Sequence, residues 1–174
     1  MLAANLYRVL GKKTNIESKD TQDEKVKFVN KNNENYDTKL NSNEEELINA
    51  DKTFTIKSFL RGAESAFKII VSSYKDNNIE SAESLLSPKV LKAFQEQTDA
   101  QSKIKAFQIT DIKSSIIKIE MVKKLAKIKV MFLSTQKNIL EKKDETIDVK
   151  DVWTFEKIIG SKDPTWILSE VTSE

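Results

Sequence analysis

The apolar residues of this chain change their spacing once, near Ile104, and that change limits the class of fold. Before Ile104 they recur every three or four residues, which is typical of helices with one buried face. After it they alternate with polar residues, which is typical of strands in a sheet. Helices followed by a meander of strands predict an α+β domain whose N-terminal helices pack on one face of an antiparallel sheet.

The helical part is predicted to contain three segments. An amphipathic helix of about twenty residues begins near Ile56, because its apolar residues share one face. A turn at residues 76–78 separates it from a short second helix. Ser87 followed by Pro88 is typical of an N-cap and a first helical position. A third helix is therefore predicted to begin there and to end near Lys103.

Four strands are predicted after the change of period. The first is long, and its alternation slips between Ile116 and Ile117, which indicates a bulge. The other three are predicted at residues 125–132, 147–158 and 165–171. Trp153 and Phe155 lie two apart on the third strand, so they share one face of the sheet. That face needs a large apolar cover, which the helices supply.

The residue types that are missing exclude much of enzyme chemistry. The 174 residues include no cysteine and no histidine. The chain therefore offers no disulfide, no thiolate nucleophile, no histidine-based triad and none of the usual zinc or haem ligand sets. Its 29 basic and 27 acidic residues leave a net charge of +2, which is far from the strongly basic balance typical of nucleic-acid-binding domains. We expect no cofactor, no metal ion, no catalytic residue and no nucleic-acid partner.

Residues 1–13 form an amphipathic and basic segment that is expected to lie near a membrane. Ten helical residues reach about 15 Å, half of a hydrocarbon core, so the segment enters a membrane surface without crossing it. The residues expected to make this contact are Leu2, Leu6, Val9, Leu10, Lys12 and Lys13. The alternative is a frayed N-terminus.

Residues 14–53 are predicted to be a flexible polar linker. Their apolar residues are too sparse to offset an ordering entropy of about 1–2 kcal/mol per residue. The folded domain is then expected to cover residues 54–174.

Three blocks of residues stand in an order and spacing that resemble the Tim44-like domain. The blocks are Phe59, Leu60, Arg61, Gly62 and Ala63 with Ala66, Phe67, Ile70 and Val71; Leu85, Leu86, Ser87 and Pro88 with Val90 and Phe94; and Asp151, Val152, Trp153, Thr154, Phe155 and Glu156 with Trp166, Ile167 and Leu168. The resemblance covers about residues 56–172. Residues 10–14 also look like the basic stretch that follows the N-terminal membrane helix in bacterial members of the family, a helix that this sequence lacks.

The resemblance implies a cone-like fold of the nuclear transport factor two-like group, with a curved sheet and an apolar pocket. It implies a membrane-associated, non-catalytic adaptor that docks a protein partner, in protein translocation or membrane-protein assembly. The expected location is the inner membrane, facing the cytoplasm in a bacterium or the matrix in a mitochondrion. Attachment would be peripheral or through the missing helix, and anionic lipid such as cardiolipin is a further expected contact. A soluble carrier of a small apolar ligand is the first alternative.

Two sets of side chains are candidate contact sites. The first set could line the implied pocket or simply pack a core, and consists of Phe59, Phe67, Phe94, Phe132, Trp153 and Phe155. The second set could contact an anionic surface or simply stay solvated, and consists of Lys123, Lys124, Lys127 and Lys129.

An isomerase-like enzyme is the second alternative, since carboxylate bases work in apolar pockets of cone-like folds. Asp151 and Tyr74 are the only candidates for that chemistry. Asp151 is in phase with Trp153 and could therefore face inward, but its position near the start of a strand favours surface pairing or turn capping.

Overall fold

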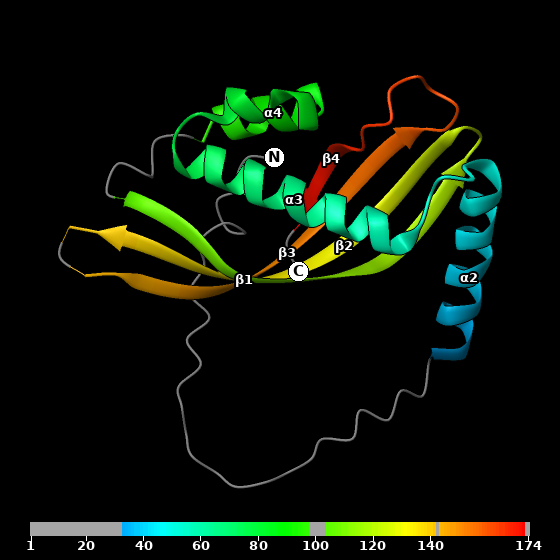
Figure 1. The fold of residues 1–174 in the computed structure, drawn as a ribbon, viewed down its shortest axis with the longest axis horizontal. Helices are drawn as coiled ribbons and strands as arrows, with labels where there is room; N and C mark the ends of the chain where they lie inside the picture. The colour runs from blue at the N-terminus through cyan, green and yellow to red at the C-terminus, as the bar shows by residue number, and fades with distance from the viewer. Residues whose placement is uncertain (1–32, 98–103, 142, 173–174) are drawn as a thin grey trace, which may run out of the picture.

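The computed structural model describes residues 33–97, 104–141 and 143–172 as an α+β domain (Figure 1). Its elements are α2 (Asn33–Ala50), α3 (Ile56–Lys75), the 3-10 helix η1 (Ile79–Leu85), α4 (Pro88–Gln95), β1 (Ile104–Val122), β2 (Leu125–Leu140), β3 (Glu145–Ile158) and β4 (Ile167–Thr172). The strands form one antiparallel sheet in the order β1-β2-β3-β4. The predicted class, helices followed by an antiparallel sheet, is confirmed.

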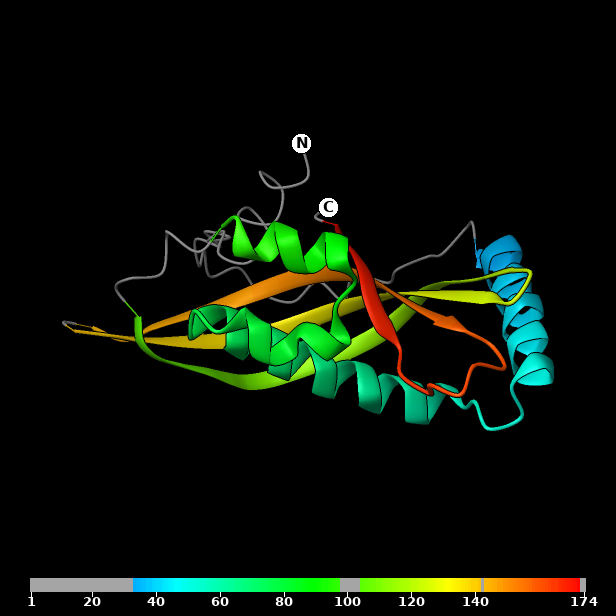
Figure 2. The same cartoon turned by 90° about the horizontal axis from the view of Figure 1, so that it is seen from above.

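The long helix α3 begins where the sequence predicts it. Thr55 is its N-cap, and the hydroxyl oxygen of Thr55 accepts a hydrogen bond from the backbone N–H of Ser58 at 3.2 Å. The apolar face predicted from the spacing is buried, including Phe59, Phe67 and Ile70. Figures 1 and 2 show this helix crossing one face of the sheet. It closes the core from one side.

The two shorter helices differ in part from the prediction. The second segment is a 3-10 helix, η1. The third, α4, has Ser87 as N-cap and Pro88 at its first position, as predicted. It ends at Gln95, however, eight residues before the predicted end at Lys103. The backbone N–H of Ser87 also donates to the carbonyl of Leu168 at 2.9 Å, so the start of α4 covers the edge of β4.

The sheet is built from long strands with irregular pairing. The register of β1 against β2 shifts between Ile116 and Lys118, which confirms the predicted bulge, and shifts again between Ile109 and Asp111. Strand β2 continues eight residues past its predicted end at Phe132. Its second half turns three polar side chains to the inner face, where they are buried: Ser134, Gln136 and Asn138.

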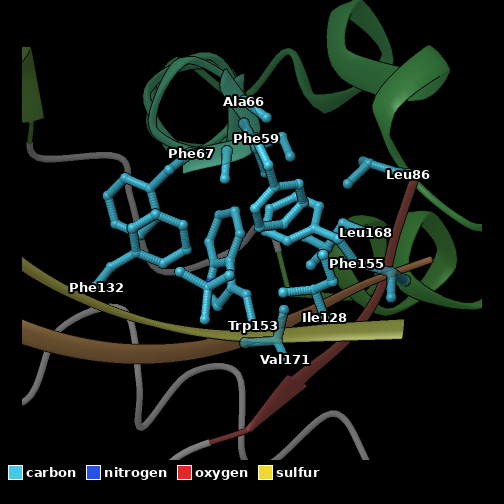
Figure 3. Packing of buried hydrophobic residues seen from close by; sticks show 14 of the residues in the cluster. Phe59, Ala66, Phe67, Leu86, Ile128, Phe132, Trp153, Phe155, Leu168 and Val171 are labelled. Atoms are coloured by element: carbon cyan, nitrogen blue, oxygen red, sulfur yellow. The ribbon is translucent and has the colours of Figure 1, made fainter. Parts of the chain in front are cut away.

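Aromatic rings fill the space between α3 and the sheet (Figure 3). The ring of Phe67 on α3 lies 4.6 Å from that of Phe132 and 4.7 Å from that of Trp153, measured between centroids. Trp153 and Phe155 share the inner face of β3, as their spacing predicts. Fully burying each such ring contributes about 1.5–3 kcal/mol or more to folding.

Helix α2 corrects the prediction of a flexible linker up to residue 53. Residues 33–50 are helical, and Leu47 is completely buried against the core. The side-chain amide of Asn43 donates to the backbone carbonyl of Ile119 on β1 at 2.7 Å. The folded part therefore begins before residue 54. Residues 1–32, with the six predicted membrane contacts and nearly half of the predicted linker, lie outside the described residues.

Candidate functional site

A cavity of about 350 Å³ lies beside the N-terminal half of α3. Its walls come from the connection between α2 and α3, from α3 itself, from the end of β3 and from the loop before β4. The residues that line it are Asp51, Thr53, Phe54, Thr55, Ser58, Phe59, Gly62, Ala63, Ala66, Leu85, Phe155, Lys157, Pro164, Thr165 and Trp166. We call it the aromatic cavity.

Four aromatic rings give the cavity its apolar wall. The centroid of Phe59 lies 4.9 Å from that of Trp166, 6.0 Å from that of Phe54 and 6.1 Å from that of Phe155. The contacts of Phe59 with Trp166 and Phe155 are edge-on and its contact with Phe54 is tilted, and such contacts favour defined ring orientations. Figure 3 shows Phe59 on the helix directed toward Phe155 on the sheet. The wall is therefore fixed by two separate parts of the fold.

One ion pair stands at the edge of the aromatic cavity. The Nζ of Lys157 lies 2.9 Å from the Oδ2 of Asp51, and the two side chains are only 13% and 15% exposed. Thr53 donates two more hydrogen bonds to Oδ1 of Asp51, from its backbone N–H and its hydroxyl. These bonds from Thr53, together with the one from Lys157, lower the pKa of Asp51 to about 2. Lys157 also lies 5.9 Å from the ring of Trp166.

Gly62 leaves part of the cavity open. A Cβ atom built on Gly62 would meet nothing within 4 Å. The residue lies in the middle of α3, where glycine costs about 0.5–1 kcal/mol relative to alanine. A Cβ atom at this position on the cavity lining therefore has free space.

The six aromatic residues predicted as pocket lining are not gathered in one place. Phe59 and Phe155 line the aromatic cavity. Phe67, Phe132 and Trp153 pack on one another in the closed core, and Phe94 packs on Tyr74 with 5.1 Å between ring centroids. The other lining residues were not predicted, and among them Phe54, Trp166, Asp51 and Lys157 supply the remaining aromatic rings and the charged groups.

The four predicted surface lysines fall into two groups. Lys123 and Lys124 form the exposed turn between β1 and β2. Lys127 and Lys129 face a groove of about 280 Å³ on the outer face of the sheet. That groove is also lined by Lys89, Lys118, Glu120, Thr154, Glu156, Ser169 and Glu170.

The charges that line the outer groove nearly cancel, with four lysines facing three glutamates. The Nζ of Lys127 lies 2.7 Å from Oε1 of Glu156, and that of Lys118 lies 2.5 Å from Oε1 of Glu120. The bond to Glu156 raises the pKa of Lys127, and the bond from Lys118 lowers the pKa of Glu120. The basic character predicted for this strand is thus largely neutralised by its neighbours.

Asp151 does not lie at the surface, so the expectation of surface pairing or turn capping is wrong. Its side chain is 1% exposed, faces the core from the middle of β3 and has no hydrogen-bond partner on either oxygen. Burial raises the pKa of Asp151 to about 8, against the opposing charge of Lys75. Neither Asp151 nor Tyr74 lines the aromatic cavity.

These features define a class of protein, an α+β domain whose helices cover one sheet face and leave a cavity with aromatic walls at one end. The Tim44-like domain family matches residues 41–173. The chain therefore belongs to the Tim44-like domain family, whose members are generally non-catalytic, membrane-associated adaptors.

The solved structures add a likeness of fold. The intermembrane space region of the chloroplast protein ARC6 is similar, with a TM-score of 0.50 and 16% sequence identity over 70% of this chain and 98% of that one. No curated protein matches the chain. Within the described residues, no helix combines the length and apolar character that a membrane span requires.

Proposed function

We propose that this chain is a membrane-associated, non-catalytic adaptor that docks an apolar segment of a protein partner in the aromatic cavity. It would act at the inner membrane, in protein translocation or membrane-protein assembly. The observation that carries the proposal is the cavity itself, with aromatic walls and an ion pair at its edge. Family membership supports the adaptor role.

The cavity is better suited to binding a partner segment than to catalysing a reaction. Its acidic and basic groups, Asp51 and Lys157, are bound to each other, so neither is placed to move a proton. At about 350 Å³ it lies at the small end of the range for ligand pockets, about 300–1,000 Å³. It therefore suits a few apolar side chains of an extended partner segment, anchored where water is excluded.

Site-directed cross-linking tests this docking. A photoreactive residue at Ser58, on the cavity wall, is expected to cross-link the full chain to a protein in native membranes. The substitution Gly62→Leu fills the cavity and is expected to abolish that cross-link. Ser65→Leu adds the same side chain at an exposed site on the same helix and should leave it intact. A cross-link that survives Gly62→Leu contradicts the proposal.

A soluble carrier of a small apolar ligand is the second candidate, because the cavity has aromatic walls and its volume still falls within the range for ligand pockets. Native mass spectrometry of the purified chain distinguishes the two functions. A bound lipid or fatty acid that Gly62→Leu removes would favour the carrier. A cavity that is empty in the purified chain, with a cross-link in membranes, favours the adaptor.

Membrane attachment is proposed to involve residues 1–13. Burying Leu2, Leu6, Val9 and Leu10 would contribute a few kcal/mol, and each of Lys12 and Lys13 about 1 kcal/mol near anionic lipid. Removing residues 1–13 is expected to reduce flotation of the chain with cardiolipin-containing vesicles. Unchanged flotation would show that this segment is not the anchor.

A further inference from the structure

The connection between α2 and α3 supplies one wall of the aromatic cavity. Asp51, Thr53, Phe54 and Thr55 all line the cavity, and they come directly after the last turn of α2. Figures 1 and 2 show α2 at one end of the sheet, apart from the other helices. We call residues 42–55 the N-terminal arm. Because the arm is continuous, a movement of α2 also moves this wall.

Few side chains hold the helical part of the arm to the domain. Among residues 42–50, Leu47 is the one buried side chain, at 0% exposure. The side-chain amide of Asn43 adds a hydrogen bond to the carbonyl of Ile119 on β1, at 2.7 Å. By contrast, α3 buries eight side chains along its length. Detaching the arm therefore uncovers far fewer buried side chains than detaching α3.

Helix α2 is also weak in its intrinsic preference for helix. Five of its 18 residues are asparagine, which favours helix less than alanine, lysine or glutamate. Its last turn has no basic side chain to interact with the negative end of the helix dipole. Most helical stability in proteins comes from packing rather than from propensity. The helical state of α2 therefore depends on the contacts of Leu47 and Asn43.

Two further contacts hold the connection against the cavity. The Oδ2 of Asp51 lies 2.9 Å from the Nζ of Lys157 on β3. The ring of Phe54, 7% exposed, lies 6.0 Å from the ring of Phe59 and 6.0 Å from that of Trp166. The connection thus touches the other walls through side chains and contributes no strand to the sheet.

We propose that the N-terminal arm is a lid that opens to admit a partner segment to the aromatic cavity and then closes over it. A segment with few buried contacts opens locally at a lower cost in free energy than the unfolding of the whole domain. Closing returns Phe54 to the wall and excludes water from the bound apolar side chains. This inference rests on the proposed docking function and adds how the partner segment enters and is retained.

Thiol labelling of the purified full chain tests the lid. The sequence has no cysteine, so one introduced cysteine is the only thiol. Ala63→Cys places it on the cavity lining, at a site that is 4% exposed. Ala82→Cys places it on η1, at a site that is 0% exposed and does not line the cavity. The rate of labelling by N-ethylmaleimide, divided by the rate in the urea-unfolded chain, measures how often each site is exposed.

A lid requires that the two sites are exposed by different motions. The thiol at position 63 should label at least about tenfold faster than the thiol at position 82, because local opening needs less free energy than global unfolding. Its rate should also rise less steeply with urea, since less surface is exposed. Ala66→Cys, on the same lining at 8% exposure, gives the same comparison if Ala63→Cys does not fold.

Variants of the arm should speed the labelling at position 63. Leu47→Ala should raise the rate by about thirtyfold or more, because it removes the buried side chain that holds α2 in place. Asp51→Asn should raise it by about tenfold, because it removes the charge that accepts the bond from Lys157.

Two controls separate the lid from a general loss of stability. Ile48→Ala removes the exposed neighbour of Leu47 and should leave the rate at position 63 within about twofold. Ile70→Val weakens the packing of α3, so it should raise the rate at position 82 by about twofold to tenfold. It should leave the rate at position 63 within about twofold, because α3 stays folded when the lid opens.

Two results would overturn the lid. Equal normalised rates and equal urea dependence at positions 63 and 82 would mean that only global unfolding exposes the cavity lining. Fast labelling at position 63 that Leu47→Ala and Asp51→Asn leave unchanged would mean that the reagent enters without any movement of the arm. Neither result bears on the Ser58 cross-link, so partner docking stands or fails separately through Gly62→Leu.

Discussion

Lys75 and Asp151 place two ionisable side chains in the interior of the domain, one at the end of α3 and one in the middle of β3. The side chains are 9% and 1% exposed. Burial raises the pKa of Asp151 to about 8 and lowers the pKa of Lys75, while the attraction between the two opposes both shifts. Lys75 also lies 5.7 Å from the ring of Phe107. The interior thus favours the uncharged form of each group.

We expect the free energy of unfolding to fall as pH rises from about 4 to about 8 because of Asp151. In that range the folded chain keeps the proton on Asp151, whereas the unfolded chain has released it. The unfolded state therefore binds fewer protons, and stability drops with pH by at most about 1.4 kcal/mol per unit. Asp151→Asn cannot ionise and should flatten this part of the profile. Urea unfolding of both chains at about pH 5 and about pH 8 measures this fall in the free energy of unfolding.

Lys75 changes the free energy of unfolding in the opposite direction, at higher pH. Its pKa is lowered on folding, so the folded chain loses that proton before the unfolded chain does, and stability rises as pH approaches the ordinary value of 10.5. Lys75→Met should remove this rise and keep the fall due to Asp151. Parallel pH profiles for the original chain and Asp151→Asn would contradict the account of the buried pair.

Gly62→Ala is expected to stabilise the domain by about 0.5–1 kcal/mol, because alanine is the better helix former and its Cβ has free space. Thermal melting should show a rise of about 1–4 °C. Gly160 is a matched control. It also has free space for a Cβ, but its φ of 80° strains any other residue, so Gly160→Ala should destabilise. Equal effects at both sites would contradict the explanation.

Trp153 has a buried indole N–H without an acceptor. Trp153→Ala should cost about 3–5 kcal/mol, because the ring fills the core between Phe67 and Phe132. Trp153→Phe should cost much less, since it keeps a ring in place and removes a donor whose desolvation costs about 1–3 kcal/mol. Denaturant unfolding of the two variants gives the comparison. Similar losses for both would show that the N–H is satisfied in solution.

The class of fold was predictable because the core itself sets the spacing of apolar residues. The change of period near Ile104 follows directly from which side chains meet between α3 and the sheet. The second half of β2 was missed because its inner face is polar: Gln136 is fully buried without being apolar. Alternation of hydrophobicity carries no signal for such a strand.

The sequence predicted only some of the residues that line the aromatic cavity. Phe59 and Phe155 belong to periodic patterns, whereas Phe54 and Trp166 lie in connections where no period applies. Asp51 and Lys157 are 106 residues apart, and only the fold brings them together. Asp151 was misjudged because its position near the start of the predicted strand outweighed its phase with Trp153, whereas the side chain follows that phase and is buried.

Asp51→Asn is expected to lower the free energy of unfolding, because it disrupts the hydrogen bonds at the edge of the aromatic cavity. The change removes a charge that accepts bonds from Lys157 and Thr53, and losing hydrogen bonds to a charged group costs about 1–3 kcal/mol. The pKa of Asp51 is depressed, so its stabilising contribution is present above about pH 4 and is lost as pH falls toward about 2. Asp51→Asn should therefore lose little further stability on acidification. An unchanged slope in acid would contradict this.

Helix α2 offers the sharpest test of where the folded domain begins. It has few apolar residues, so its helical state depends on docking through Leu47 and on the bond from Asn43 to Ile119. Leu47→Ala should cost about 2–5 kcal/mol and expose the helix to hydrogen exchange. Ile48→Ala, the neighbouring residue at 37% exposure, should cost less than about 1 kcal/mol. Equal effects would mean that α2 does not belong to the cooperative unit, and that residues after Asp51 fold alone.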